Sequence, residues 1–313
     1  MNQHVFSKSS HVVAIGGGHG LGRLLSAFDF LEHRLTGIVA TTDNGGSTGR
    51  LREETGCIAW GDLRNCLSQL TREKDLKSLL FDYRFKDDTG SLKGHSLGNM
   101  MLLALDDMCV RPMDTLTLFR DFFNIKSRII PMAEMPAHLV ACCANGDNVH
   151  GEVGIDALES VPQRIKIVPG VSATKEAINE INRADLILMG PGSFITSVMP
   201  PLLVTEIAAA IHKSHAPKIL IGNMVAEDGP SGKIPLKEKL QWMEMQIGYN
   251  IVDAIIWPES REIIGDSPSN LILSDLFFEG HERLHDRNKL VNTVSQVYSQ
   301  LSKKKVIHPL RAG

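Results

Sequence analysis

The stretch VVAIGGGHGLG at residues 12–22 carries the strongest structural signal in this chain. Its apolar start predicts a buried strand, and the closely spaced glycines that follow predict a tight turn into a helix. Backbone N–H groups in such a turn can approach a phosphate at the positive end of the helix. We therefore predict that the turn binds a ligand through Gly16, Gly17, Gly18, His19 and Gly20.

The glycine spacing of this turn departs from the ordinary dinucleotide fingerprint. The G-x-G-x-x-G pattern fails because Leu21 stands where the third glycine belongs. A nicotinamide-dependent dehydrogenase is therefore disfavoured. A structural alternative stays open, in which the glycines serve only the close packing of the strand on the helix.

Short apolar runs alternate with longer helical patterns along the chain, which is typical of α/β proteins. We predict a Rossmann-like, mostly parallel sheet with helices on both faces, because continuous apolar runs are expected where both sheet faces are covered. The predicted strands are 12–16, 35–41, 164–168, 185–189, 218–222 and 251–257.

Two additions interrupt this alternation. Helical patterns dominate between about 62 and 124 and predict a helical insertion. Segments 128–132, 138–143 and 149–153 predict a small antiparallel meander. We expect one domain over 11–302, with loose tails at 1–10 and 303–313.

The second predicted strand ends in TTDNGGSTGR, residues 41–50. Asp43 closes that strand, where a carboxylate can accept from ribose hydroxyls or hold a divalent cation such as Mg²⁺. An Asx turn is the structural alternative for Asp43. Further donors and acceptors for a ligand come from Asn44, Gly45, Gly46, Ser47 and Arg50.

Two more strand exits carry polar or glycine-rich residues, in the segments GPGSF at 190–194 and GNM at 222–224. Because the carboxyl ends of parallel strands share one edge of a sheet, we expect these exits to converge on one crevice. Polar residues at the starts of two helices in the insertion are expected there too, although helix capping alone would explain Asp62. The additional candidates are Gly190, Gly192, Ser193, Asn223, Asp62, Asn65, His95 and Asn99.

Composition narrows the function classes. The formal net charge is -3, which disfavours a nucleic-acid polymer as partner. The five cysteines form no C-x-x-C pair, and no apolar run approaches the length of a membrane span, so we expect a cytoplasmic protein without membrane insertion. No nucleophile motif occurs, so catalytic residues stay unknown and enzymatic turnover is not predicted from the residues alone.

Several independent motifs then occur in an order that resembles one family: GGGHG, TTDNGGSTGRLR, WGDLRNCL, YRF, GHSLGN, ADLILMGPGSF and IGNM. Together they resemble the YvcK/YbhK-type gluconeogenesis factors, relatives of the 2-phospho-L-lactate transferase (CofD) family, over about residues 11–301. The resemblance implies a cytoplasmic bacterial protein that binds UDP-sugars such as UDP-N-acetylglucosamine. It also implies a role in cell shape and envelope synthesis during gluconeogenic growth, with regulatory partners and a homodimer as candidate assemblies.

Two departures from the family pattern bear on mechanism. His19 stands where the family often has Thr, and Asp43 is followed by Asn44 rather than by a second acid. The first interpretation is therefore a UDP-sugar-responsive regulator without turnover. The alternative is a CofD-like transferase that moves a phosphate-linked group from a nucleotide donor to an unknown acceptor with Mg²⁺.

Overall fold

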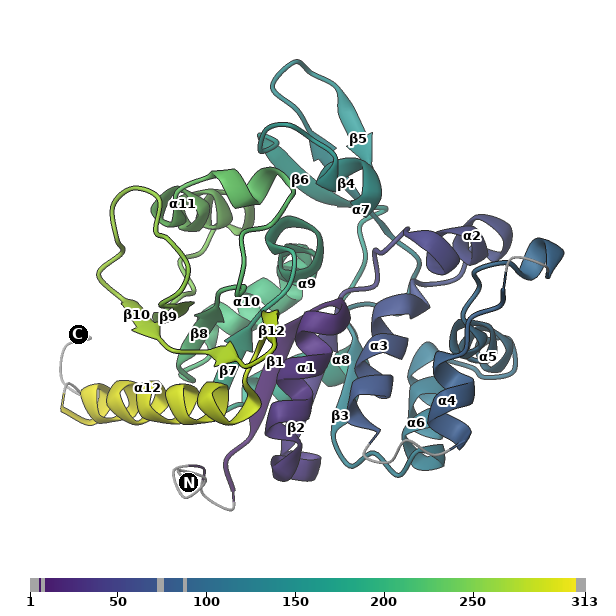
Figure 1. Cartoon of the computed structure of the whole chain (residues 1–313), viewed down its shortest axis with the longest axis horizontal. Helices are drawn as coiled ribbons and strands as arrows, with labels where there is room; N and C mark the ends of the chain where they lie inside the picture. The colour runs from purple at the N-terminus through teal and green to yellow at the C-terminus, as the bar shows by residue number, and fades with distance from the viewer. Residues whose placement is uncertain (1–5, 7–8, 72–75, 87–88, 308–313) are drawn as a thin grey trace.

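A seven-stranded parallel sheet forms the centre of the protein in a computed structural model that describes residues 6, 9–71, 76–86 and 89–307 (Figure 1). The strand order β10-β9-β8-β7-β1-β2-β3 confirms the predicted Rossmann-like α/β class. The strands are β1 (Val12–Gly16), β2 (Leu35–Val39), β3 (Arg128–Pro131), β7 (Leu186–Met189), β8 (Lys218–Ile221), β9 (Ala254–Pro258) and β10 (Leu271–Ser274).

Both faces of this sheet are covered by helices, which explains the continuous apolar runs of its central strands. Val12 and Ala14 of β1 pack into one core, and Val13 and Ile15 pack into the other. The first core is closed by α1 (Gly18–Phe28), α3 (Trp60–Leu70) and α12 (Arg287–Ile307). The second is closed by α8 (Lys175–Arg183), α9 (Met199–Leu203), α10 (Thr205–Lys213) and α11 (Leu236–Ile247).

The helices expected between about 62 and 124 form the connection from β2 to β3. Besides α3 they are α4 (Leu76–Asp82), α5 (Leu97–Asp106) and α6 (Pro112–Phe122), and α2 (Gly46–Thr55) precedes them. Helix α3 lies beside α1 on the sheet, whereas α4, α5 and α6 lie farther out, beyond β3 (Figure 1).

Two sequence predictions about strands were wrong. Segment 128–132 was expected in the antiparallel meander, but β3 pairs in parallel with β2. Segment 164–168 was expected in the parallel sheet, but β6 (Arg164–Val168) pairs antiparallel with β4 (His138–Cys142), which also pairs with β5 (Asn148–His150). The exposed ends of β6 suit a small sheet that is covered on one face only.

The C-terminal region contains strands that the sequence did not predict. Besides β10, these are β11 (Phe277–Phe278) and β12 (His281–His285), which form a short antiparallel ribbon. Helix α12 continues to Ile307, past the expected start of the tail at 303. In the segment expected as an N-terminal tail, Phe6 is buried and its ring lies 5.7 Å from that of Tyr298.

The order of the strands fixes where a ligand can bind. The chain runs from β1 to β2 and β3 on one side, and β7 to β10 continue on the other. The point where this order reverses lies between β1 and β7, and in open parallel sheets ligands bind outside the carboxyl ends of the strands at that point. The turn after β1 and the turn after β7 therefore frame the candidate site.

No single described helix is long and apolar enough to cross a membrane, although the bent pair 194–203 and 205–213 would pass by length and composition together.

Candidate functional site

The turns after β1 and β7 touch each other, and Gly20 is required by that contact. A Cβ added at Gly20 would lie 2.4 Å from the carbonyl oxygen of Pro191. A Cβ added at Gly17 would lie 2.3 Å from Oδ2 of Asp62, so the start of α3 also presses on the first turn. Close packing against backbone therefore accounts for Gly20 whether or not a ligand is bound, whereas the contact at Gly17 is with the end of a side chain.

Asp62 lies in the first turn of α3 and is buried, with 8% of its surface exposed. Its carboxylate accepts a hydrogen bond from the N–H of Gly18. Burial raises the pKa of Asp62 to about 7, and the neighbouring carboxylate of Asp43 adds to this rise. A carboxyl group of this kind exchanges protons near neutral pH and is a candidate for a functional role.

Asp43 and Glu152 extend this acidic group. Oδ1 of Asp43 accepts a hydrogen bond of 2.7 Å from the N–H of Gly45. Glu152 opens the short helix α7 (Glu152–Asp156), and burial together with the charges of Asp62, Asp43 and Asp156 raises the pKa of Glu152 to about 9. The site thus has an acidic half, made by residues that lie about 110 positions apart in the sequence.

Sequence reasoning missed Glu152 and Asp156. Oδ1 of Asp156 lies 3.1 Å from Oγ1 of Thr196, and burial raises the pKa of this carboxyl group. Neither acid belongs to a glycine-rich strand exit of the parallel sheet, because both are on the helix that connects β5 to β6 of the antiparallel sheet. No sequence signal identifies these two acids as site residues; only their position in the folded chain does.

The opposite half of the site is a pocket of about 250 Å³ beside the N-terminus of α1. Burial and the charge of Arg64 lower the pKa of His19, which favours the neutral form of its ring. Arg23 faces the same pocket, and its guanidinium donates to the carbonyl oxygen of His285 at 2.7 and 2.9 Å. The lining residues are His19, Gly20, Arg23, Leu24, Pro191, Gly192, Ser193, Asn223, Arg283, Leu284, His285 and Leu290.

The turn after β7 is held by the protein itself. The N–H of Gly192 donates to Oδ1 of Asn223 at 2.9 Å, and Nδ2 of Asn223 donates back to the carbonyl oxygen of Gly192 at 2.8 Å. The N–H of Phe194 donates to Oε2 of Glu227 at 2.8 Å. These two backbone donors are therefore occupied, and Asn223 braces the turn rather than presenting a free amide.

Predicted residues from the helical segment form a second polar group. Oγ of Ser47 lies 3.1 Å from Nδ1 of His95 and 3.3 Å from Nδ2 of Asn99. Ser47, His95 and Asn99 are all buried, and Oδ1 of Asn99 has no hydrogen-bond partner among the described residues. The structure thus joins three predicted residues through the N-termini of α2 and α5.

Three other predicted residues have partners within the chain. Arg50 donates to the carbonyl oxygen of Lys93 at 2.7 Å. Asn44 accepts from the N–H of Val153 at 3.1 Å. Asn65 accepts from the guanidinium of Arg64. Ligand contacts for these residues stay predictions.

Arg52, which was not among the residues predicted from the sequence, holds the backbone beside Asp43 in the acidic half of the site. It is buried, and its guanidinium donates to the carbonyl oxygens of Thr42 at 3.1 Å and Asp43 at 2.8 Å. It also donates to the carbonyl oxygen of Ala137, at 2.5 Å. Arg52 therefore ties the exit of β2 to the start of β4 and holds Asp43 in place.

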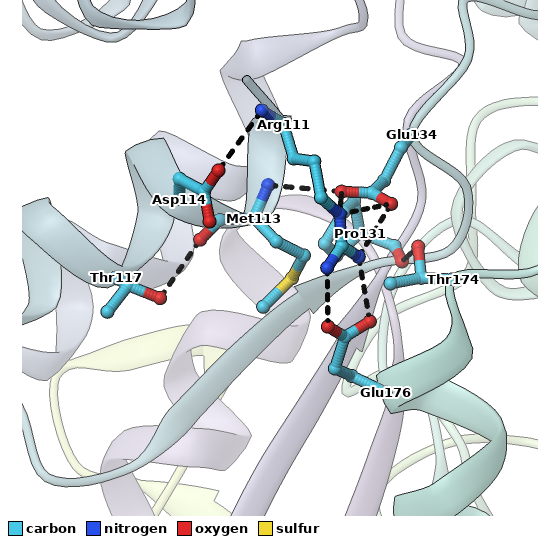
Figure 2. Close-up of polar contacts among 8 residues, drawn as sticks. All are labelled: Arg111, Met113, Asp114, Thr117, Pro131, Glu134, Thr174 and Glu176. Carbon is cyan, nitrogen blue, oxygen red and sulfur yellow. Dashed lines mark hydrogen bonds and ion pairs between the residues drawn. The ribbon is translucent and has the colours of Figure 1, made fainter. Parts of the chain in front are cut away.

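A separate ionic group lies at the exit of the edge strand β3 (Figure 2). Arg111 pairs with Glu134 at 2.8 Å and with Glu176 at 2.9 Å. The N–H of Met113 also donates to Glu134, at 3.3 Å. This group joins the start of α6, the exit of β3 and the start of α8, so we assign it to the fold.

The side chains of the acidic half limit how a metal ion could be held there. No group of three or more His, Cys, Asp or Glu side chains in the described part of the chain is arranged to hold one. Mg²⁺, however, is commonly held by one or two carboxylates together with substrate phosphates. Asp43 and Asp62 suit that shared mode, because the charge of Asp43 raises the pKa of the neighbouring Asp62 and a cation between them would offset that repulsion.

Comparison with known proteins gives consistent matches. Residues 12–274 match the family model described as 2-phospho-L-lactate transferase CofD. A protein named "Putative gluconeogenesis factor" from Pasteurella multocida is 47% identical over 94% of this chain and 96% of its own length. A protein of the same name from Yersinia pestis is 44% identical over 96% of this chain and 98% of its own length. The crystal structure of a UPF0052 family member from Bacillus halodurans has a TM-score of 0.83 and 29% identity, covering 94% of this chain and 99% of that one.

Proposed function

The chain belongs to the 2-phospho-L-lactate transferase CofD family, and on that premise we propose that its crevice between β1 and β7 binds a nucleotide-linked phosphate ester. UDP-N-acetylglucosamine is the ligand that we place first. In this proposal the protein is a cytosolic regulator of envelope synthesis and cell shape during gluconeogenic growth, and its response depends on occupancy of the site.

One observation carries the proposal: a glycine turn at a helix N-terminus and the buried carboxyl group of Asp62, with the partly buried Asp43 and Glu152 beside it, meet at the reversal of strand order. The turn after β1 suits phosphate oxygens, because backbone N–H groups and the helix dipole favour negative charge there. The carboxyl oxygens of Asp43, Asp62 and Glu152 suit sugar or ribose hydroxyls, which donate hydrogen bonds. A nucleotide sugar offers both kinds of group.

A transferase is the second candidate, and the raised pKa of Asp62 favours it. In such a reaction an acceptor hydroxyl attacks the phosphorus next to the sugar, the bond from that phosphorus to the bridging oxygen breaks, and UMP leaves. Asp62 would take the proton of the acceptor hydroxyl, and Asp43 would hold Mg²⁺ against the diphosphate. Bound Mg²⁺ would neutralise charge on the phosphates.

Thermal shift measurements over nucleotide sugars, dinucleotides and deazaflavins test the ligand. We expect UDP-N-acetylglucosamine to raise the melting temperature, and a ligand at about 100 times its dissociation constant adds roughly 2.7 kcal/mol to the stability. Chromatography of the same mixture with Mg²⁺ and candidate acceptors then separates the candidates. Intact ligand supports the regulator, whereas UMP released in step with a new sugar phosphate ester supports the transferase.

A further inference from the structure

Four helices begin close together, beside the exits of β1 and β2. They are α1, α2, α3 and α5, with 11, 10, 11 and 10 residues, so each carries a positive partial charge at its first turn. The start of α1 meets the start of α3 at Gly17, and a Cβ added at Gly61 of α3 would lie 2.2 Å from Oγ1 of Thr48 in α2. The N-cap of α5, Ser96, donates its N–H to Oγ of Ser47 in α2 at 3.2 Å. The positive ends of four helices therefore converge.

A buried arginine adds a full positive charge at this place. Arg64 lies near the start of α3, and its side chain is 7% exposed. A Cβ added at Gly98, in the first turn of α5, would lie 2.9 Å from Cδ of Arg64. A cation is disfavoured at the positive end of a helix, because the two charges have the same sign. The position of Arg64 is therefore best suited to a protein that binds an anion there.

The partners of Arg64 within the chain compensate its charge only in part. Nη1 of Arg64 pairs with Oδ1 of Asp82 at 2.8 Å, but the side chain of Asp82 is 49% exposed. Oδ2 of Asp82 also accepts from Oγ of Ser68 at 2.6 Å. Nη2 of Arg64 donates to the neutral amide oxygen of Asn65, and its Nε has no hydrogen-bond partner among the described residues. One buried donor of Arg64 is thus left for a ligand.

Arg84 brings a second positive charge to the same helix ends. It forms an isolated bridge with Ser96, and its Nη1 donates to the carbonyl oxygen of Gly94 at 3.3 Å. Burial lowers the pKa of His19, and the charges of Arg64 and Arg84 lower it further. Since His19 lies in the first turn of α1, both arginines are also close to the start of α1.

The two acids in this region are engaged with other donors. Asp62 accepts from the N–H of Gly18, and Asp43 accepts from the N–H of Gly45. Within the described part of the chain, neither acid is hydrogen-bonded to Arg64. The positive charge of Arg64 is therefore still available to an anion.

We propose that the starts of α1, α2, α3 and α5 hold a diphosphate, and that Arg64 selects a diphosphate over a single phosphate. The inference rests on the proposed function of the crevice and places the charged part of its ligand. A diphosphate can reach more than one of the four helix starts at once, and inorganic pyrophosphate carries more negative charge than phosphate. Arg64 then makes a charge-assisted hydrogen bond that a shorter anion bound at α1 alone does not require.

Isothermal titration of the full chain with inorganic pyrophosphate, inorganic phosphate and UDP-N-acetylglucosamine, at one fixed Mg²⁺ concentration, tests the proposal. We expect the wild type to bind pyrophosphate more tightly than phosphate. Arg64→Gln should weaken the binding of pyrophosphate and of the sugar nucleotide by roughly 10-fold or more, as for the loss of a charged hydrogen bond. Arg128→Gln is the matched control, because Arg128 pairs with Glu180 at the opposite end of the sheet, and it should leave binding unchanged.

Asp82→Asn separates a role in binding from a role in the fold. It removes the carboxylate that competes with the ligand for Arg64, so the affinity for pyrophosphate should rise by roughly threefold, the scale of a half-exposed ion pair. If the pair only joined α3 to α4, Asp82→Asn would weaken binding or leave it unchanged, and either result would overturn the proposal even if Arg64→Gln does not fold.

The same titrations distinguish this inference from the proposed function. A wild type that binds pyrophosphate no more tightly than phosphate would overturn the diphosphate subsite, as would a folded Arg64→Gln variant with unchanged affinity. A chain that binds pyrophosphate through Arg64 but does not bind UDP-N-acetylglucosamine would keep the subsite and overturn the ligand assignment.

Discussion

Replacing Asp62 by Asn should stabilise the protein at alkaline pH. The pKa of Asp62 is raised to about 7 in the folded protein, from an ordinary value of 3.8. At about 1.4 kcal/mol for each tenfold change in proton affinity, this difference corresponds to roughly 4 kcal/mol. Asn cannot ionise, and its Oδ1 can still accept from the N–H of Gly18, so most of the cost of the buried charge is removed.

The sign of this effect follows from the order in which the two states lose the proton. As pH rises from about 4 to 7, the unfolded chain releases the Asp62 proton first, so the wild type loses stability across that window. The variant has no such loss. Its gain should therefore be near zero at pH 4 and should approach roughly 4 kcal/mol above pH 8.

Urea denaturation at pH 4, 6 and 8 measures this difference directly. Asp266→Asn is the matched control, because the side chain of Asp266 is 86% exposed and should show no pH-dependent gain. We expect the Asp62→Asn variant to bind ligand more weakly despite its higher stability, as is common when a strained site is relieved. A variant no more stable than the wild type at pH 8 would refute the argument from burial.

Three further outcomes are expected. Glu152→Gln should gain stability relative to the wild type between about pH 4.5 and 9, because the pKa of Glu152 is raised to about 9; identical pH profiles in urea would contradict this. Asn223→Ala removes both hydrogen bonds to Gly192 and should lower the free energy of unfolding by roughly 1 to 3 kcal/mol, so an unchanged denaturation midpoint would argue against the brace. Gly192→Val should lower the melting temperature before ligand is added, because the φ of Gly192 is +147° and a Cβ there would lie 3.4 Å from Cβ of Ser197. A variant that melts at the wild-type temperature, as measured by circular dichroism, would speak against this backbone strain.

The sequence predicted the central strands well because their signals are local. β1 is apolar and is followed at once by glycines, and the observed bounds match the predicted segment 12–16. The segments of β3 and β6 were each assigned to the wrong sheet, because a short apolar run does not indicate which sheet a strand joins. Both strands pair with partners that are distant in the sequence. β3 pairs with β2 across the intervening helices, and β6 pairs with β4 across the segment that contains β5 and α7.

The sequence predicts the members of the candidate site that belong to its glycine-rich and polar motifs, and it misses those that come from distant segments. Asp43 and Asp62 belong to motifs that the sequence displays. Glu152 reaches them only because α7 folds back beside the exit of β2, where Asn44 accepts from the N–H of Val153. The bracing roles of Asn223 and Glu227 were likewise hidden, since both depend on side chains that meet the turn after β7 in three dimensions.

Isothermal titration of UDP-N-acetylglucosamine, with and without Mg²⁺, tests the central claim most directly when the wild type and Asp43→Asn are compared. Asn at this position can still accept from the N–H of Gly45, so the unliganded melting temperature should stay close to that of the wild type. The account predicts one site per chain in the wild type and clearly weaker binding in the variant, with the larger loss in Mg²⁺. A wild type that binds another nucleotide but not this sugar nucleotide, or an Asp43→Asn variant that binds with unchanged affinity in both conditions, would contradict it.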